Sequence, residues 1–173
     1  MILDINYSDA IYGESDIDER IDEDLIQEAA VQLIALELLG GVDEEAIIKA
    51  EELPLYIGVS VVSEDEIREI NKDFRGIDKV TDVLSFPQFE NAEEIIEELE
   101  GDEALVDIPV GVICLDQAER QSLEYGTTIR REVTYLFVHS ILHLLGYDHM
   151  EDGDKTEMRK REELIMAALD ITR

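Results

Sequence analysis

The amino-acid sequence predicts one α+β domain, with about four strands in a small β-sheet and about five helices packed with it. At 173 residues, 45% of them hydrophobic, the chain has the length of one domain and enough apolar side chains for one core. Short β-rich runs alternate with segments whose apolar residues recur at helical spacing. Because no internal repeat or low-complexity linker divides the chain, we expect residues 1–173 to form a single domain.

The N-terminal third predicts an edge strand, a long helix and a central strand. We expect the edge strand at 2–6, followed by an acidic loop. Apolar residues recur at helical spacing from 22 to 39, which predicts an amphipathic core helix that ends at two glycines. Residues 43–52 are expected to add a helical turn or two. The near-continuous apolar run 54–62 is typical of a strand inside a sheet.

The middle of the chain predicts a capped helix and a third strand. Ser63 and Glu66 form the S-x-x-E capping box that opens a helix over 64–74. The buried stripe of this helix is predicted to be Ile67, Ile70 and Phe74. A strand over 81–86 should end at Pro87. The acidic segment 88–107 reads as a solvated, partly flexible excursion in which residues 95–99 can form a short helix.

The last third predicts one more strand and three helices. The strand is expected at 108–114, and a short helix at 117–124. The main helix should run over 128–145, with one entirely apolar side and its histidines in the middle of the core. A final helix over 154–169 is expected to cover the sheet. Its predicted packing residues are Met158, Leu164, Ile165 and Ala168.

Composition limits where the protein works. The single cysteine, Cys114, excludes an intramolecular disulfide and fits a reducing compartment. The longest apolar stretch, 29–42, is interrupted by Gln32 and Glu37, so we expect no membrane span. The chain also opens without a basic-then-apolar leader. A soluble, cytoplasmic protein is therefore expected.

The net charge of −30 repels nucleic acid at long range. The basic residues are nevertheless unevenly placed, since only Arg20 and Lys49 precede residue 68. A basic rim on an acidic body is therefore compatible with the sequence. Composition slightly disfavours RNA as a ligand without excluding it. The acidic surface favours a basic protein partner.

All histidines of the chain, three in number, lie within the eleven residues HSILHLLGYDH. His139 and His143 are four residues apart, so on a helix both imidazoles project from one face. Gly146 suits a left-handed turn that can bring His149 back towards them. A lone histidine on a Leu-rich helix is usually an ordinary core residue. Three at this spacing, with none elsewhere, favour a zinc-type site with one open coordination position.

The spacing matches the H-E-x-x-H-x-x-G-x-x-H motif of the metzincin proteases, except that Ser140 replaces the glutamate. Serine cannot act as the general base that this protease mechanism takes from that position. The sequence thus predicts a protease-like metal cage without the protease's base. A metzincin-like protease remains an alternative, and a less favoured one.

Arg75 and Gly76 are expected to close the helix over 64–74, just before Thr81 and Asp82. In a structural interpretation Arg75 complements a helix dipole, and Thr81 with Asp82 forms a side-chain-bonded turn. In a functional one, the fork of Arg75 binds phosphate oxygens beside an open metal position. The residues alone favour the structural interpretation.

These motifs together resemble the YbeY family of metal-dependent endoribonucleases. The resemblance rests on HSILHLLGYDH, on FRG and TDVLSFP upstream, and on the Glu-Met…Glu-Glu helix downstream, and it covers about residues 54–170. It implies an α+β domain with a small mixed sheet and one zinc-like ion on a central buried helix and the following turn. It also implies a single-strand-specific endoribonuclease that matures the 3′ end of small-subunit ribosomal RNA and acts in ribosome quality control.

Carried over residue by residue, the resemblance implies the following site. His139, His143 and His149 match the metal ligands, with Arg75 and His143 in catalytic roles. The residues expected to line the cleft or to support the ligands are Thr81, Asp82, Ser85 and Asp148. Ser140 stands where many members have glycine. Val110 stands where the family typically has the Asp of L-G-D-I-V-I-C, which is the larger departure.

We therefore expect metal-assisted hydrolysis of RNA, with one Zn²⁺ per chain or another divalent transition metal in its place. The general base is left unassigned. The expected partners are ribosomal RNA and the ribosome, with a ribosomal protein as a further candidate. The main alternative is a ribosome-assembly or RNA-binding factor with a structural metal. The sequence does not indicate an oligomeric state.

Overall fold

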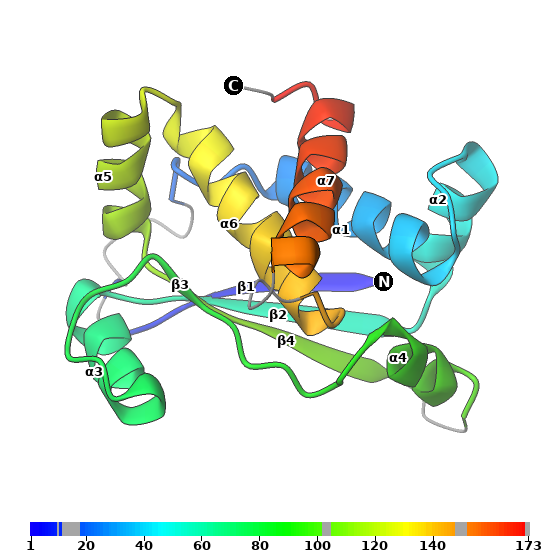
Figure 1. The fold of residues 1–173 in the computed structure, drawn as a ribbon, viewed down its shortest axis with the longest axis horizontal. Coiled ribbons are helices and arrows are strands. Elements are labelled where there is room, and N and C mark those ends of the chain that lie inside the picture. Colours follow the sequence, from blue (N-terminus) through cyan, green and yellow to red (C-terminus); the bar gives the residue numbers. More distant parts are fainter. Residues whose placement is uncertain (10, 12–17, 102–104, 148–151, 172–173) are drawn as a thin grey trace.

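The computed structural model of the protein describes residues 1–9, 11, 18–101, 105–147 and 152–171, with only the backbone described for 152–154. In this part of the chain four strands form one sheet in the order β1-β2-β4-β3 (Figure 1). Their bounds are Ile2–Tyr7 (β1), Leu55–Val61 (β2), Val83–Leu84 (β3) and Val106–Ile113 (β4). β1 and β4 are parallel to β2, whereas β3 is antiparallel to β4. The predicted mixed sheet, its edge strand β1 and its internal strand β2 are confirmed.

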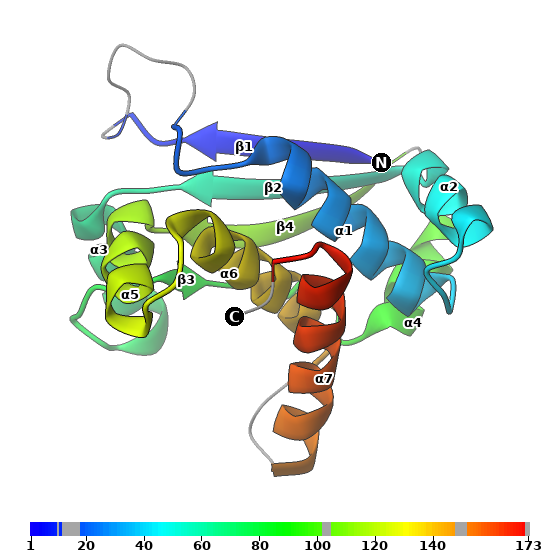
Figure 2. The ribbon, with the colours of Figure 1, turned by 90° about the horizontal axis from the view of Figure 1, so that it is seen from above.

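Seven helices accompany the sheet in the described residues. They are α1 (Glu23–Leu38), α2 (Glu44–Glu52), α3 (Glu64–Arg75), α4 (Ala92–Leu99), α5 (Leu115–Tyr125), α6 (Ile129–Leu144) and α7 (Asp152–Ala168). Helices α1, α5, α6 and α7 lie on one side of the sheet, and α3 lies on the other (Figure 1). Seen from above, α1 and α6 run next to each other over the strands (Figure 2). The α+β class is confirmed, with α2 and α4 more fully formed than the sequence indicated.

The core lies between the sheet and the helices α1, α6 and α7. β2 alternates buried and half-buried residues, and its buried set is Leu55, Ile57, Val59 and Val61. This is the pattern of a strand with one face on the core and one face nearer to solvent. α6 supplies the fully buried Phe137 and Leu142. It is therefore the central buried helix that the sequence predicted.

Two predicted packing faces were correct only in part, since Ile67, Met158 and Ile165 are buried but other predicted members are exposed. Phe74 is 71% exposed, because the small apolar cluster under α3, which includes Ile67 and Leu84, ends before the last turn of the helix. On α7 the buried stripe is Met158, Glu162, Ile165 and Leu169, so Leu164 and Ala168 face outwards. The main packing partners of α7 are α6 and α1, which lie between it and the sheet that it was expected to cover.

β3 is shorter than the predicted strand 81–86, because the chain passes very close to β4. Gly111 has φ +122°, and a Cβ built on it would lie 2.0 Å from the carbonyl oxygen of Leu84. Gly58 pairs with Pro109 and Val59 with Gly111, so Val110 is the extra residue of a β-bulge. The bulge and the close approach end the pairing after Leu84. Ser85 onwards is released towards α6.

The described part of the acidic segment 88–107 contains the helix α4, which starts before the predicted 95–99. Asn91 caps α4 by accepting a hydrogen bond from the backbone N–H of Glu94, and Ile95 of this helix is fully buried in the main core. Ala92 and Leu99 of the same helix also pack against this core, so its apolar side anchors an otherwise acidic helix. As for membranes, no helix among the described residues is both long and apolar enough to cross one.

Candidate metal centre and cleft

α6 positions two of the predicted metal ligands. The helix starts at a Thr128 cap, whose hydroxyl accepts from the backbone N–H of Arg131, and continues for 16 residues. His139 and His143 lie one turn apart, and both are half-buried where the sequence predicted full burial. His143 lines a cavity, and His139 lies one turn before it on the same side of α6. That location leaves the imidazoles accessible to a ligand.

The two imidazoles face each other through Nε2, with 3.1 Å between these atoms. Nδ1 of His139 lies 2.7 Å from Oε1 of Glu162, and Nδ1 of His143 lies 2.9 Å from the backbone oxygen of Tyr147. A carboxylate and a carbonyl only accept hydrogen bonds, so in neutral rings both protons reside on Nδ1. Both Nε2 lone pairs then point into the same space.

This geometry fits a bound metal ion. Two nitrogen ligands of a tetrahedral zinc ion, each about 2.0–2.1 Å from it, are about 3.3–3.4 Å apart. The observed 3.1 Å is close to that separation. Metal-binding histidines also commonly donate their second N–H to a carboxylate or a backbone carbonyl, which are the two partners found here. The donor set therefore suits zinc or a similar transition metal.

Glu162 is a site residue that the sequence analysis missed. It is 6% exposed, and its Oε2 accepts a hydrogen bond of 3.1 Å from the hydroxyl of Tyr135. Burial and the adjacent carboxylate raise the pKa of Tyr135, so this hydroxyl stays protonated and donates. The sequence did contain a signal for a role of Glu162. This position carries a carboxylate on the otherwise apolar stripe of Met158, Ile165 and Leu169.

Tyr147 is held in place by the N-terminal third of the chain. Its hydroxyl donates to Oε2 of Glu37 on α1 at 2.7 Å. Nε of Arg161 on α7 lies 3.4 Å from Oε1 of Glu37, which is close enough for an ion pair. The two groups are not aligned for a hydrogen bond. Burial and the bond to Glu37 raise the pKa of Tyr147. Since the carbonyl of Tyr147 orients His143, α1 contributes to the site, where the sequence had indicated no chemistry.

The turn after α6 is built on Gly146, as predicted. Its φ is +91°, and a Cβ on it would lie 2.6 Å from the carbonyl oxygen of Glu90. Glycine is therefore required both by the backbone conformation and by the close approach of the segment before α4. The predicted third ligand, His149, and the predicted supporting residue Asp148 lie outside the described residues. Within the described residues no cluster of three His, Cys, Asp or Glu side chains forms a metal site.

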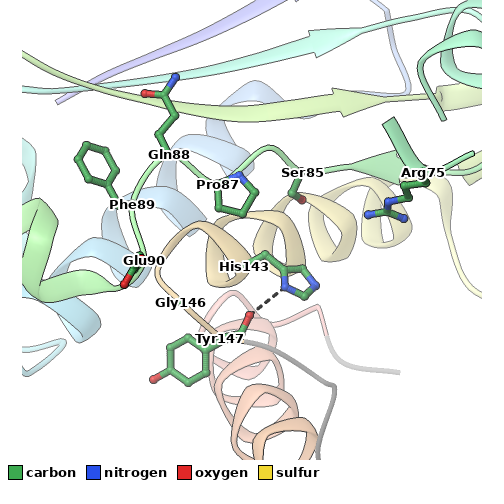
Figure 3. A pocket seen from close by; sticks show the side chains of 9 residues that line it. All are labelled: Arg75, Ser85, Pro87, Gln88, Phe89, Glu90, His143, Gly146 and Tyr147. Atoms are coloured by element: carbon green, nitrogen blue, oxygen red, sulfur yellow. Dashed lines mark hydrogen bonds between the residues drawn. The ribbon is translucent and has the colours of Figure 1, made fainter. Parts of the chain in front are cut away.

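A cavity of about 590 Å³ opens beside His143 (Figure 3). Arg75, at the exposed end of α3, and Ser85, after β3, both line it. The remaining lining residues are Pro87, Gln88, Phe89, Glu90, Gly146 and Tyr147. The end of α3, the chain after β3 and the distant α6 thus bring a guanidinium, a hydroxyl and an imidazole to one cavity.

Ser140 connects this cavity to the sheet. It is fully buried, its hydroxyl donates to the backbone oxygen of Val110 at 3.1 Å, and Oγ of Ser85 lies 2.6 Å from it. Ser140 thus holds α6 against the β4 bulge and the loop after β3. Val110, the position at which the resemblance led us to expect an aspartate, is fully buried in the apolar core.

Thr81 and Asp82 make hydrogen bonds at the start of β3. Oδ1 of Asp82 accepts from the Thr81 hydroxyl at 3.0 Å and from the backbone N–H of Val83 at 2.8 Å. The backbone oxygen of Asp82 accepts from the N–H of Cys114. Neither residue belongs to the described set that lines the cavity. Their visible contacts fix the start of β3 beside the end of β4.

Comparison with known proteins identifies relatives along most of the chain. The family model described as "Endoribonuclease YbeY" matches residues 16–170, a range that includes α1 and α2. A protein of Thermoanaerobacter sp. (strain X514) named "Endoribonuclease YbeY" is 47% identical over 135 residues, covering 75% of this chain and 84% of that protein. A Clostridium botulinum (strain Alaska E43) protein of the same name is 48% identical over 141 residues, covering 75% and 85%.

A solved structure is also similar. The solution structure of TM1509 from Thermotoga maritima aligns with a TM-score of 0.54 and 27% sequence identity. The alignment covers 98% of this chain and 89% of that one. The similarity therefore extends over the whole arrangement of sheet and helices.

Proposed function

The chain belongs to the YbeY family of endoribonucleases, and from this premise we propose that it is a hydrolytic nuclease that cuts single-stranded RNA. The observation that carries the proposal is the pair of Nε2 atoms 3.1 Å apart beside a cavity that Arg75 also lines. A metal position next to a guanidinium suits the cleavage of a phosphodiester, which is anionic and becomes more so in the transition state.

His139, His143 and His149 would hold the ion, one per chain, with zinc the preferred identity and another divalent transition metal the alternative. When bound, such an ion supplies Lewis acidity, which lowers the pKa of a water and polarises a phosphoryl oxygen. Glu162 and the carbonyl of Tyr147 keep each Nδ1 protonated, so that Nε2 is the donor atom in both rings.

Arg75 would bind the phosphate. Its planar fork matches two phosphate oxygens, and its charge offsets the negative charge that develops during hydrolysis. The side chain is exposed at the C-terminus of α3, so it can reach RNA without paying for burial. Ser85 shapes the wall between Arg75 and α6 through its contact with Ser140.

We further propose ribosomal RNA as the substrate, at the 3′ end of the small-subunit RNA, within maturation and quality control of the ribosome in the cytoplasm. The resemblance of the motifs supports this assignment. With a net charge of −30, the protein would gain from a partner that presents RNA, and a ribosomal protein with a basic tail has the complementary charge.

The same acidic surface favours a second candidate, an assembly factor that binds RNA and whose metal is structural. A protease is disfavoured by position 140. Ser140 has no carboxylate that could act as the protease's general base. Its side chain is also fully buried and hydrogen-bonded to the backbone of β4.

Substitution of Arg75 tests the proposal. Arg75→Ala should keep the metal and lose about 10²–10³-fold in single-turnover cleavage of an RNA from the small-subunit 3′ end, as when one charge-stabilising donor is removed. His143→Ala should lose both metal and cleavage. Arg159→Ala, an exposed arginine on α7, serves as the matched control and should cleave normally.

Undiminished cleavage by Arg75→Ala would contradict the role of this residue, and stoichiometric zinc in His143→Ala would contradict the metal site. Wild-type protein that holds one ion per chain but leaves RNA intact would favour the assembly factor.

A further inference from the structure

Phe74 is a large aromatic side chain that lies outside the hydrophobic core. It is 71% exposed on the last turn of α3. Burial of such a ring stabilises a fold, and leaving it in water forgoes that gain. Exposed apolar side chains next to a cavity are a common mark of a binding surface.

The ring of Phe74 packs against that of Phe86. Its centroid lies 4.8 Å from that of Phe86, with the planes inclined by 53°. α3 ends in a left-handed Gly76, whose N–H bonds to Lys72 while the N–H of Ile77 bonds to Asn71. The bond from Gly76 to Lys72 is that of the αL motif, which ends the helix at a left-handed residue.

The loop after α3 is fixed as well. Nδ2 of the buried Asn71 donates to the backbone oxygen of Lys79 at 2.8 Å. Asp78 accepts from Arg68 at 2.6 Å and from Lys72 at 3.0 Å. Such preorganisation lowers the entropic cost of binding a ligand on this surface.

Phe74 is next to the proposed phosphate-binding residue. It directly precedes Arg75, and its partner Phe86 lies between Ser85 and Pro87, both of which line the cavity. The two rings thus belong to the same two segments, the end of α3 and the chain after β3, that bring Arg75 and Ser85 to the cavity beside His143.

The surroundings favour a single flat ring as the ligand. Besides Phe74, the neighbouring exposed apolar side chain is Ile77, at 47%. Charged residues flank the two, namely Arg68, Lys72, Asp73, Arg75, Asp78 and Lys79. A stable protein interface takes about 800 Å² from each partner around an apolar centre, far more than these two side chains provide. One aromatic face beside a guanidinium is, however, how single-stranded RNA is bound, by base stacking and phosphate contact.

We propose that Phe74 is a stacking platform for one unpaired base of the RNA, adjacent to the phosphate bound by Arg75. The inference rests on the proposed function and deepens it. A base inside a duplex has both faces covered by its neighbours, whereas an unpaired base can turn one face onto the ring. Phe74 would in this way contribute to the choice of single-stranded substrate.

The test combines protein variants with RNA lacking one base. Steady-state cleavage gives KM and kcat, and fluorescence anisotropy of a labelled oligonucleotide with chelator present gives Kd. Phe74→Ala should raise KM and Kd by about 5- to 100-fold, the range for loss of one stacked base, with kcat nearly unchanged. Phe74→Trp should bind at least as well as wild type. Phe74→Leu keeps an apolar contact with Phe86 but has no aromatic face, so its Kd for RNA should be raised as in Phe74→Ala. Ile77→Ala should bind RNA with the Kd of the wild type.

An abasic nucleotide is then moved along the oligonucleotide. At one position it should weaken binding to wild type and add no further loss to Phe74→Ala, which is the signature of a direct pair. Equal Kd and KM for wild type and Phe74→Ala would overturn the inference, and so would losses that add at every abasic position. If the wild type binds RNA but does not cut it, the nuclease proposal fails. The comparison of Kd values for Phe74→Ala and abasic RNA then still tests whether Phe74 stacks on a base. Unchanged RNA binding with loss of a protein partner in Phe74→Ala would also overturn it.

Discussion

Nδ1 of His139 and Oε1 of Glu162 lie 2.7 Å apart and join α6 to α7 at the candidate metal centre. The carboxylate is buried, and a tyrosine on α6 itself, Tyr135, holds its second oxygen. The C-terminal helix is thus part of the site, although it carries none of the predicted ligands among its described residues. The contact fixes both the tautomer and the orientation of the imidazole.

Replacement of Glu162 should therefore weaken metal binding. We expect Glu162→Gln to lower zinc affinity by about 10- to 100-fold, since the amide accepts the His139 proton less strongly than a carboxylate does. Competition with a chromophoric chelator measures this affinity. The control is Glu163→Gln, whose side chain is 76% exposed on the same helix. Equal affinities for the two variants would show that Glu162 does not support the ligand.

The turn at Gly146 should tolerate no side chain. Gly146→Ala forces alanine to φ +91° and places its Cβ against the backbone of Glu90. Gly126→Ala is the matched control, because Gly126 also has positive φ, +68°, but nothing lies within 4 Å of its Cβ position. We expect a loss of about 1 kcal/mol in unfolding free energy for Gly126→Ala and about 3 kcal/mol or more for Gly146→Ala. Urea denaturation of both variants decides the matter, and equal losses would refute the steric argument.

The bond between Tyr147 and Glu37 should matter for both stability and metal binding. Tyr147→Phe removes the hydroxyl that donates to Glu37, whose side chain is only 9% exposed. We expect this loss to cost about 1–3 kcal/mol in unfolding free energy. Zinc affinity should fall too, because the carbonyl of Tyr147 orients His143. Tyr56→Phe removes a similar bond, to the half-buried Asp4, and should cost less. A larger loss in Tyr56→Phe would contradict this ranking.

Glu66 should make the protein less stable in acid. Hydrogen bonds from Ser8 and from Ser63 lower the pKa of its carboxyl below the ordinary 4.5. A lowered folded-state pKa means that the carboxylate stabilises the fold above pH 4.5 and that this contribution disappears as the pH falls through the lowered value. Wild type should exceed Glu66→Gln by about 1 kcal/mol at pH 7, and the difference should shrink as the pH falls below 4.5.

Glu69→Gln, an exposed change on the same helix, is the control and should leave the pH profile unaltered. A constant difference between wild type and Glu66→Gln over this pH range would contradict the linkage.

The parts of the site that sequence reasoning predicted are local in the chain. His139 and His143 are one helical turn apart, and Gly146 follows within the same motif, so helix geometry and glycine conformation fix their relation. The capping box of Ser63 and Glu66 is likewise local, and the structure forms both of its hydrogen bonds.

The parts that were missed depend on tertiary contacts. Glu162 and Glu37 reach the site from 23 and 110 residues away, and nothing near them in sequence indicates their partners. Helical periodicity wrongly predicted that Phe74 is buried. Periodicity shows which side of α3 faces the core, but it does not show at which turn of the helix the core ends. The strand predicted up to Phe86 stops at Leu84 because of Gly111, a contact between segments that only the fold brings together.

The central claim is that the histidine centre beside Arg75 drives RNA cleavage. The most direct measurement is a titration of metal-free protein with zinc while cleavage of a small-subunit rRNA 3′ fragment is followed. We predict no cleavage without metal and a rise that saturates at one equivalent per chain. Cleavage by the metal-free protein at the full rate, or protein that binds no zinc at all, would contradict the account.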